Sequence, residues 1–404
     1  MNATPTIDSP QGKRLIGILA AGGGEARFVG GCVRDVLIGR PYKDVDISTT
    51  LFPEDTLRVL KNAHIRVIPT GLAHGTVTAV VDGVSFEITT LREDVACDGR
   101  HAEVAFTDSW QADAARRDFT INAMNMDAEG AIHDYFGGRT DLRKKIVRFV
   151  GSPVLRIQED YLRILRLFRF HAYYGGGEIL PEQLQACAAC AEGIRQLSGE
   201  RIQMEMLKLL SAPTPLYALS AMVQTGVLSR VLPGMEGNIY LNGLEALINL
   251  PHHSNALVRL ASILRGASEQ TVEGIANYWR LSGEDKKHLL RVTFPECEVN
   301  GALDEHGQRH AFRLLGKAVF LDVALLAWAE EGQGAAESFE AMLELGQSWN
   351  PPKLPIRGVD LLRLGVKEGK EIGRLLKIAE DYWEANHYTP ARAELLALVE
   401  AARL

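Results

Sequence analysis

The sequence Gly-Gly-Cys-Val-Arg-Asp-Val-Leu-Ile-Gly-Arg-Pro-Tyr-Lys-Asp-Val-Asp occupies residues 30–46, and our expectation for the N-terminal fold rests on it. A short β-type run at 27–29 precedes the paired glycines, and a second at 45–48 carries the last aspartate. Asp44 and Asp46 alternate with apolar residues, which places both carboxylates on one face of a strand. The pattern therefore predicts two strands, with a glycine turn after the first and acidic groups on the second.

The two aspartates suggest a metal–phosphate site. Carboxylates about 7 Å apart along a strand repel each other unless a cation lies between them. A hard divalent ion such as Mg²⁺ would hold Asp44 and Asp46 together and recruit the oxygens of a substrate phosphate. The paired glycines let backbone N–H groups approach an anion, and Arg34 adds a fixed positive charge. Without the neighbouring glycines and Arg34, an Asp-x-Asp pattern also fits a solvated turn, which is the alternative to a metal site.

A second polar group is Arg-Arg-Asp-Phe-Thr-Ile-Asn-Ala-Met at residues 116–124. Arg116, Arg117, Asp118 and Asn122 can bind phosphate oxygens and ribose hydroxyls, while the apolar residues between them anchor the segment. A run of charges on the surface is the alternative interpretation.

A third group, Gln-Glu-Asp-Tyr-Leu-Arg-Ile-Leu-Arg-Leu-Phe-Arg-Phe, occupies residues 158–170. At about 100° per residue it predicts one helix with a buried apolar stripe and an ionic face that carries Asp160, Arg163, Arg166 and Arg169. Asp160 offers only acceptors and Arg163 only donors, so together they can match the edge of a nucleotide base. The alternative is an i,i+3 ion pair on a solvated face.

The composition predicts a soluble globular chain. With 404 residues, 46% of them apolar and 24% charged, two or three domains are expected. Residues 1–170 hold 22 basic and 22 acidic side chains, so the net charge of −7 lies in the remainder. This excludes a general polycationic coat for nucleic acid, although residues 139–169 carry nine basic against three acidic side chains. The β-type runs, at 27–29, 45–48, 76–81, 85–90 and 146–150, give way to helical spacing after residue 155.

The cysteines and the apolar runs predict the cellular compartment and whether the chain holds a structural metal. Five cysteines, an odd number, argue against a disulfide framework and favour a reducing compartment, so we expect a cytoplasmic protein. We expect no membrane span, because no stretch approaches roughly 18 apolar residues. Cys187 and Cys190 have the spacing of zinc ligands without a second pair, so we expect no structural zinc. The sequence predicts no oligomeric state.

In order and spacing, the three groups resemble the class II tRNA nucleotidyltransferase and bacterial poly(A) polymerase family, whose members are polymerase-β-like nucleotidyltransferases. The resemblance covers the first 170 residues and 200–210, and residues 354–373 are similar to the tail of bacterial CCA-adding enzymes. It implies an α+β fold: an N-terminal α/β nucleotidyltransferase head followed by an all-helical neck, body and tail. The implied boundaries are 1–145 for the head, 146–215 for the neck, 216–350 for the body and 351–404 for the tail.

The resemblance also implies roles for individual residues. Asp44 and Asp46 would bind two catalytic Mg²⁺ ions, with Glu87 as a third acidic group. Residues 89–113, including Arg92 and Arg100, would be the family's flexible loop. The implied nucleotide-binding residues are Gly31, Arg34, Arg117, Asp118, Asn122, Asp160, Arg163, Arg166 and Arg169. Among these, Asp160 and Arg163 match the family's Glu-Asp-x-x-Arg motif, in which protein side chains select CTP and then ATP without a nucleic-acid template.

The implied function is template-independent addition of CCA to the 3′ end of tRNA from CTP and ATP, with release of pyrophosphate. Poly(A) addition and partial addition of CC or A are alternatives. The net acidic C-terminal part argues against poly(A) addition. The length of the segment 89–113 argues against an enzyme that adds only CC. A catalytically silent RNA-binding protein is a remoter alternative, against which the intact aspartate pair stands. The acceptor end of tRNA would be bound through its phosphates, at 139–148 and at basic residues of the tail, namely Lys353, Arg357, Arg363, Lys367, Lys370 and Arg374.

Overall fold

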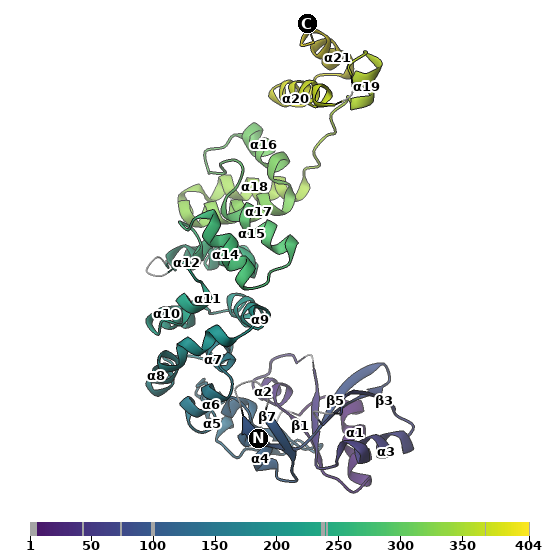
Figure 1. The fold of residues 1–404 in the computed structure, drawn as a ribbon, viewed down its shortest axis with the longest axis vertical. Helices are drawn as coiled ribbons and strands as arrows, with labels where there is room; N and C mark the ends of the chain where they lie inside the picture. Colours follow the sequence, from purple (N-terminus) through teal and green to yellow (C-terminus); the bar gives the residue numbers. More distant parts are fainter. Residues whose placement is uncertain are drawn as a thin grey trace. The chain divides into compact units, whose positions relative to one another are not determined.

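The computed structural model describes residues 6–42, 44–72, 75–97, 102–235, 239, 241–367 and 369–403 (Figure 1). The chain divides into two compact units. The first holds residues 1–239 and 274–281, and the second holds residues 240–273 and 282–404. This division is coarser than the four predicted segments, which remain a prediction.

A seven-stranded mixed sheet forms the centre of the N-terminal part. Its order is β3-β4-β5-β2-β1-β8-β9, in which β2 and β5 run parallel and the other neighbours run antiparallel. The strands are β1 (Ala26–Val29), β2 (Asp46–Thr49), β3 (Arg66–Gly71), β4 (Thr76–Val81), β5 (Val84–Thr90), β8 (Asn125–Met126) and β9 (Ile132–His133). The predicted runs at 27–29, 45–48, 76–81 and 85–90 are therefore confirmed within a residue or two.

The strand expected at 146–150 is wrong. Only a single bridge, Phe119 to Phe149, forms there. The side chain of Gln183 hydrogen-bonds to the backbone of this run in place of a neighbouring strand. It accepts from the Phe149 amide at 3.0 Å and donates to the Val147 carbonyl at 2.7 Å. The apolar run is buried, but it packs between helices instead of joining the sheet.

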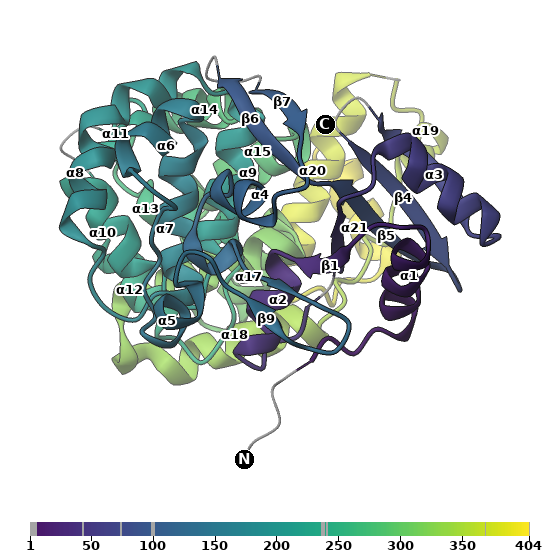
Figure 2. The same cartoon turned by 90° about the horizontal axis from the view of Figure 1, so that it is seen from below.

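Five short helices accompany the sheet. Ser9 begins the first by accepting a hydrogen bond from the Gly12 amide at 3.1 Å, and Pro10 occupies its first turn. This helix contacts β1 and β2, while the third contacts β3 and β4 (Figure 2). The helices are α1 (Pro10–Ala21), α2 (Gly31–Leu37), α3 (Pro53–Asn62), α4 (Trp110–Ala115) and α5 (Gly138–Arg143), with a 3-10 turn at Thr120–Asn122.

The stretch expected as a flexible loop contains a β-hairpin. Strand β6 (Arg92–Cys97) pairs with β7 (Ala102–Phe106) as a separate two-stranded sheet. Residues 89–90 end β5, and α4 begins at Trp110. Arg92 thus lies at the base of the hairpin, whereas Arg100 lies outside the described residues.

Helices follow the sheet, as the predicted α+β fold requires. In the first unit they are α6 (Pro153–Glu159), α7 (Leu162–Tyr174), α8 (Pro181–Cys190), α9 (Gly199–Leu210), α10 (Leu216–Gln224) and α11 (Val227–Val231), with a 3-10 segment at Ala191–Gln196. The expectation of one helix over 158–170 is wrong, because the chain is extended at Asp160 (φ −160°, ψ 108°). Asp160 therefore lies at the joint between α6 and α7.

The second unit is helical throughout its described part. Helix α17 is largely apolar and packs against α12, α15, α16 and α18, and its Phe320, Leu326 and Trp328 are buried. A separate C-terminal core gathers Leu361, Leu375, Trp383 and Leu395. The helices are α12 (Asn242–Ile248), α13 (Ala256–Ile263), α15 (Gly283–Thr293), α16 (Glu305–Leu315), α17 (Lys317–Glu331), α18 (Ala336–Ser348), α19 (Gly358–Arg363), α20 (Lys370–Ala385) and α21 (Arg392–Ala401), and α14 (Glu269–Tyr278) contributes to both units.

Candidate active site

A cavity of about 460 Å³ in the first unit brings the three sequence groups together. The glycine turn and Asp46 line one part of it, and the arginines of the neck helices line another. The lining residues are Gly30, Gly31, Arg34, Asp46, Arg116, Arg117, Asp118, Asn122, Asp160, Leu162, Arg163, Arg166, Phe170 and Arg201. Of the predicted site residues, Asp44, Glu87 and Arg169 are not part of this lining.

The glycine turn presents backbone to the cavity. Gly30 has φ +73° and caps α2, which begins at Gly31. A Cβ atom at residue 30 would lie 3.1 Å from Nη1 of Arg117, so both the backbone angle and the space favour glycine. The first amides of a helix have no acceptor within it, and this end of α2 can therefore donate to an anion.

The acidic groups lie on two parallel neighbouring strands. Asp46, at the start of β2, is in register with Glu87 on β5. Burial raises the pKa of Asp46, the negative charges of Glu87 and Asp44 raise it further, and the positive charge of Arg117 opposes them. Asp44 precedes the strand and is exposed, so the expected strand geometry is wrong for it, although its charge still acts on Asp46. The structure thus accumulates negative charge beside the cavity.

Asp46, with Glu87 and Asp44 near it, is suited to bind a cation but does not form a complete set of metal ligands within the described residues. A carboxylate whose pKa is raised by neighbouring negative charges, as that of Asp46 is, gains from a positive ion beside it. Among the described residues, however, no three Asp, Glu, His or Cys side chains converge as ligands for a metal. A divalent ion here would be held by Asp46 with a neighbouring carboxylate and would take further oxygens from a bound phosphate.

Arg34 is fixed between the head and the neck. Its guanidinium, 8% exposed, donates twice to the Asp35 carboxylate at 2.9 Å and once to Oδ1 of Asn122 at 2.6 Å. It also lies 4.0 Å from the centre of the Tyr174 ring. Contacts within the protein therefore fix the orientation of Arg34.

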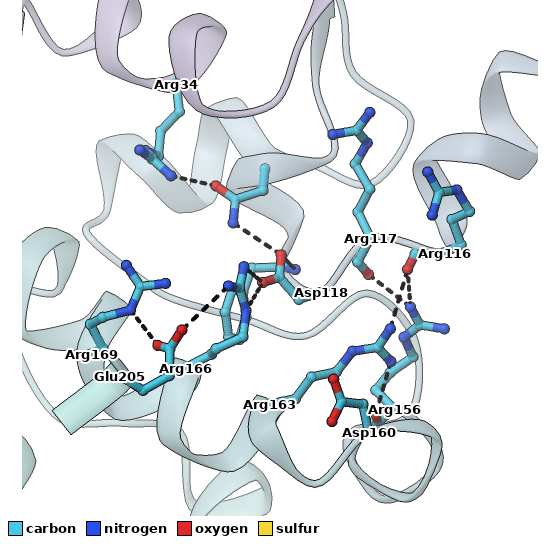
Figure 3. A network of polar contacts seen from close by, with 12 residues as sticks. Arg34, Arg116, Arg117, Asp118, Arg156, Asp160, Arg163, Arg166, Arg169 and Glu205 are labelled. Carbon is cyan, nitrogen blue, oxygen red and sulfur yellow. Dashed lines mark hydrogen bonds and ion pairs between the residues drawn. The ribbon is translucent and has the colours of Figure 1, made fainter. Parts of the chain in front are cut away.

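Asp118 is the buried acceptor of the second group. Burial alone would raise its pKa, but the charge of Arg166 and hydrogen bonds from Asn122, Arg166 and the Phe119 amide outweigh it, so the pKa lies below its usual range. Asn122 donates to Oδ1 at 3.0 Å, and Nε of Arg166 donates to Oδ2 at 2.8 Å. The chain Arg34–Asn122–Asp118–Arg166 thus connects α2 to α7, as Figure 3 shows at its labelled ends.

The two arginines before Asp118 share a buried acid. Arg116 pairs with Asp113 at 3.0 Å and Arg117 pairs with it at 3.3 Å. Burial would raise the pKa of Asp113, but the charges of Arg117 and Arg116 hold it below its usual range. Arg117 is therefore anchored beside both the glycine turn and Asp46.

The base-selecting pair predicted from the third group is not an ion pair. Oδ2 of Asp160 accepts from Arg201 at 2.7 Å, and Oδ1 accepts from the Leu162 amide at 3.1 Å. Arg163 instead pairs with Glu159 and donates to the Arg156 carbonyl at 2.8 Å. Both side chains still line the cavity, so each can face a ligand from a separately fixed position.

The two remaining predicted arginines converge on one acid that sequence reasoning missed. Glu205, 1% exposed, pairs with Arg169 at 2.5 Å and lies 3.7 Å from Arg166 (Figure 3). Arg169 points to this acid and not into the cavity. The available signal was the helical spacing of α9, where an acidic residue shares the buried face of Ile202, Met206 and Leu209.

Arg156 and Arg201 were also missed as site residues. Arg156, 8% exposed, donates to the carbonyls of Arg116 and, at 3.0 Å, Arg117 (Figure 3). Its other terminal nitrogen pairs with Glu159. Arg201 holds Asp160 from α9. Apart from Glu159, these partners lie about 40 residues away in sequence, so no local pattern indicates them.

The arrangement can place a nucleoside triphosphate between acidic and basic walls. Phosphate oxygens would meet the glycine turn, Arg34 and Arg117, while the base would extend toward Asp160 and Arg163. The thiol of Cys32 is excluded as a nucleophile, because burial raises its pKa to about 11. The chemistry that fits is therefore phosphoryl or nucleotidyl transfer governed by charge and position.

Comparisons with known proteins show which family this chain resembles. The "Poly A polymerase head domain" matches residues 26–148, and "Probable RNA and SrmB- binding site of polymerase A" matches residues 178–238. The CCA tRNA nucleotidyltransferase 1, mitochondrial, of Danio rerio is 36% identical over 92% of this chain and 86% of its own. The CCA-adding enzyme of Streptococcus gordonii is 34% identical over 90% of both chains.

The solved structures extend the similarity to the whole length. The CCA-adding enzyme of Bacillus stearothermophilus in complex with CTP superposes with a TM-score of 0.80, at 29% identity and 98% coverage of both chains. The Thermotoga maritima CCA-adding enzyme complexed with tRNA-CCA has a TM-score of 0.67 at 21% identity, which shows the fold alone.

Proposed function

The chain belongs to the family of CCA-adding tRNA nucleotidyltransferases, and from this premise we propose that its cavity adds C, C and A to the 3′ end of tRNA. The reaction uses CTP and ATP and no nucleic-acid template. The observation that carries the proposal is the single cavity that combines the glycine turn and Asp46 with Asp160 and Arg163.

In each cycle the terminal 3′-hydroxyl of the RNA attacks the α-phosphorus of the triphosphate. A new O–P bond forms, the bond to the bridging oxygen of the β-phosphate breaks, pyrophosphate leaves, and the hydroxyl proton is released. No covalent intermediate with the protein is needed. Positioning and charge supply the acceleration.

The chain's own residues hold the triphosphate. Gly31 offers backbone N–H groups at the start of α2, and Arg34 and Arg117 supply positive charge from fixed positions. Asp118 and Asn122 accept and donate hydrogen bonds at the ribose. Because these groups hydrogen-bond to one another, contacts within the protein fix their orientations, and little further ordering is needed when the nucleotide binds.

Asp46, with Asp44 and Glu87 beside it, would hold Mg²⁺. The raised pKa of Asp46 and the nearby carboxylate charges support this assignment. A bound divalent ion would lower the pKa of the attacking hydroxyl and neutralise charge on the leaving pyrophosphate.

Asp160 and Arg163 would read the base edge, one through acceptors and the other through donors. Arg201 and Glu159 fix their orientations. Arg166 would support the ribose side through Asp118, and Arg169 acts as a positioning residue through Glu205.

The compartment is part of the proposal. Among the described residues no helix is long and apolar enough to cross a membrane. Cys32 and Cys187 are free and buried, which supports a reducing compartment, and we retain the cytoplasm as the proposed location.

The test uses purified protein, tRNA lacking its last three nucleotides, and each labelled triphosphate alone and in combination. We expect two C residues from CTP alone and a complete CCA end when ATP is added. Long A tails, or arrest after CC with both triphosphates present, would replace the proposal with poly(A) or CC addition. An absence of transfer with retained tRNA binding would identify a silent RNA-binding protein.

A further inference from the structure

A second cavity, of about 430 Å³, lies in the same unit and has no role in the proposed chemistry. It is formed where three helices end. Arg40 follows the end of α2, Arg143 ends α5 and Lys145 follows it, and Tyr173 and Tyr174 end α7. Apolar Ile38 and Leu142 complete most of its lining, which contains no acidic residue. We refer to this cavity as the basic pocket.

The walls of the basic pocket are joined to one another. Arg40 donates to the Tyr173 carbonyl at 2.8 Å, which ties the end of α2 to the end of α7. The Gly176 amide donates to the Lys145 carbonyl at 3.1 Å, which ties the segment after α5 to the turn after α7. The pocket is therefore preformed.

The positive charges of the basic pocket are not neutralised within the described part of the chain. Arg40, Arg143 and Lys145 are exposed, and none of them makes an ion pair with a described carboxylate. The nearby acids are engaged elsewhere, Asp35 with Arg34 and Asp141 with Arg148. Three such cations around two aromatic rings offer a phosphate its charge partners and a sugar or base an apolar surface.

The basic pocket shares a wall with the nucleotide cavity. The Tyr174 ring lines the pocket, and the Arg34 guanidinium, which lines the nucleotide cavity, lies 4.0 Å from its centre. Arg40 lies on the same ring at 5.1 Å. A ligand in the pocket therefore lies one side chain away from the residues that hold the triphosphate.

We propose that the basic pocket binds phosphate groups of the tRNA acceptor strand, with an adjacent sugar or base against the tyrosines. This rests on the proposed function, because that function requires an RNA strand beside the nucleotide cavity. A free triphosphate fits this pocket less well, since the pocket lacks a carboxylate that would share a metal ion with it. The pocket thus positions the strand whose 3′ end reacts in the neighbouring cavity.

The test compares two double variants with equal loss of charge. Arg143→Gln with Lys145→Asn removes two cations from the pocket, and asparagine tolerates the left-handed backbone of residue 145 (φ +55°). The control, Lys61→Gln with Arg66→Gln, removes two exposed cations that neither line the pocket nor belong to residues 139–148. Affinity for tRNA lacking its last three nucleotides is measured at several KCl concentrations, together with affinity for CTP without RNA.

The pocket variant should weaken tRNA binding roughly 10-fold and reduce the slope of log K against log salt by about 1.5, as expected for two lost phosphate contacts. Its affinity for CTP and its thermal midpoint should equal those of the control. Equal tRNA affinity and slope in the two variants would overturn the proposal, and so would a loss of CTP binding in the pocket variant alone. If the wild-type chain binds tRNA but transfers no nucleotide, the proposed function fails, while the difference between the variants still decides the role of the pocket.

Discussion

The acidic and basic walls of the nucleotide cavity are built in opposite ways. On the acidic wall, Asp46 is half-buried beside Glu87, and burial and like charges raise its pKa. On the basic wall, Arg166 is paired with Asp118, and behind this wall Arg169 is paired with Glu205; both acids are almost fully buried. On the acidic wall, burial and like charges outweigh the nearby charge of Arg117, whereas on the basic wall Arg166 has a buried carboxylate partner.

The difference assigns the two walls different roles: the acidic wall serves catalysis, and the paired arginines hold the structure of the site. A buried charge near others of the same sign costs folding free energy, so the acidic wall is maintained at the expense of stability and gains from a bound cation. The paired arginines instead hold the neck helices against the head and keep their donors oriented. Substitutions on the acidic wall should therefore remove activity without unfolding, and substitutions of the acids behind the basic wall should do both.

The largest effect is expected for Asp46→Asn. Transfer of CMP should fall about 10³-fold, because the carboxylate that would hold the cation is lost. The thermal midpoint should stay the same or rise, since a carboxylate with a raised pKa is a folding cost at neutral pH. Rates of CMP incorporation, tRNA affinity and thermal unfolding test this.

Asp82→Asn is the matched control for Asp46→Asn, because Asp82 is exposed at the turn between β4 and β5. It should leave all three measurements unchanged. A normal rate of CMP incorporation by Asp46→Asn would show that the acidic wall takes no part in the reaction.

The second largest effect is expected for Asp118→Asn, which leaves Arg166 without its main partner. Loss of one member of a buried pair should lower the free energy of unfolding by about 3 kcal/mol at pH 7. The pKa of Asp118 lies below its usual range in the folded chain, so its contribution is present above about pH 4 and is lost as pH falls through the folded pKa.

Denaturant unfolding of the wild type and of Asp118→Asn at neutral and acidic pH tests this sign. The difference between them should shrink below about pH 4. A difference that grows as the pH falls would contradict the assignment of Asp118 as the ionised partner of Arg166.

A smaller effect, on selectivity, is expected for Arg163→Ala. Loss of paired donors to a base edge should reduce discrimination between CTP and UTP by roughly 10- to 100-fold. Steady-state kcat/KM for the two triphosphates measures this. Arg195→Ala, which removes an arginine from an exposed ion pair with Glu192, is the control and should keep full discrimination. Unchanged discrimination in Arg163→Ala would refute base reading by this side chain.

The smallest effect is expected for Gly30→Ala. Alanine at φ +73° costs about 1 to 2 kcal/mol, and its Cβ would crowd Nη1 of Arg117, so KM for CTP should rise a few-fold. Gly39→Ala carries the same backbone cost at φ +67° with nothing within 4 Å of its Cβ. It should lose similar stability at an unchanged KM. Equal KM values in the two variants would show that the Gly30 turn does not shape the phosphate site.

Local pattern was sufficient for the parts of the fold that depend on neighbours in sequence. Alternation predicted β2, short β-type runs predicted β4 and β5, and the glycine pair predicted the turn before α2. The break at Asp160 was missed, because periodicity continues through it while its carboxylate binds Arg201 on another helix. The run at 146–150 was assigned to a strand for the same kind of reason, since Gln183, its backbone partner, is far away in sequence.

The site shows the same limit. Motif spacing identified nine residues that line one cavity, but it did not indicate that Arg163 and Asp160 have separate partners or that Arg169 faces Glu205. Ion pairs between distant segments depend on the packing of α6, α7 and α9, which no single window of sequence contains. The acids that hold the arginines are therefore visible only in the folded chain.

The central claim is that one cavity, with its acidic and basic walls, is the nucleotide site for both CTP and ATP. Equilibrium titration of the chain with CTP, followed by ATP, tests it most directly. We predict one site per chain, with each triphosphate displacing the other and Arg163→Ala weakening the binding of both. Simultaneous binding of CTP and ATP to the same chain would contradict the account.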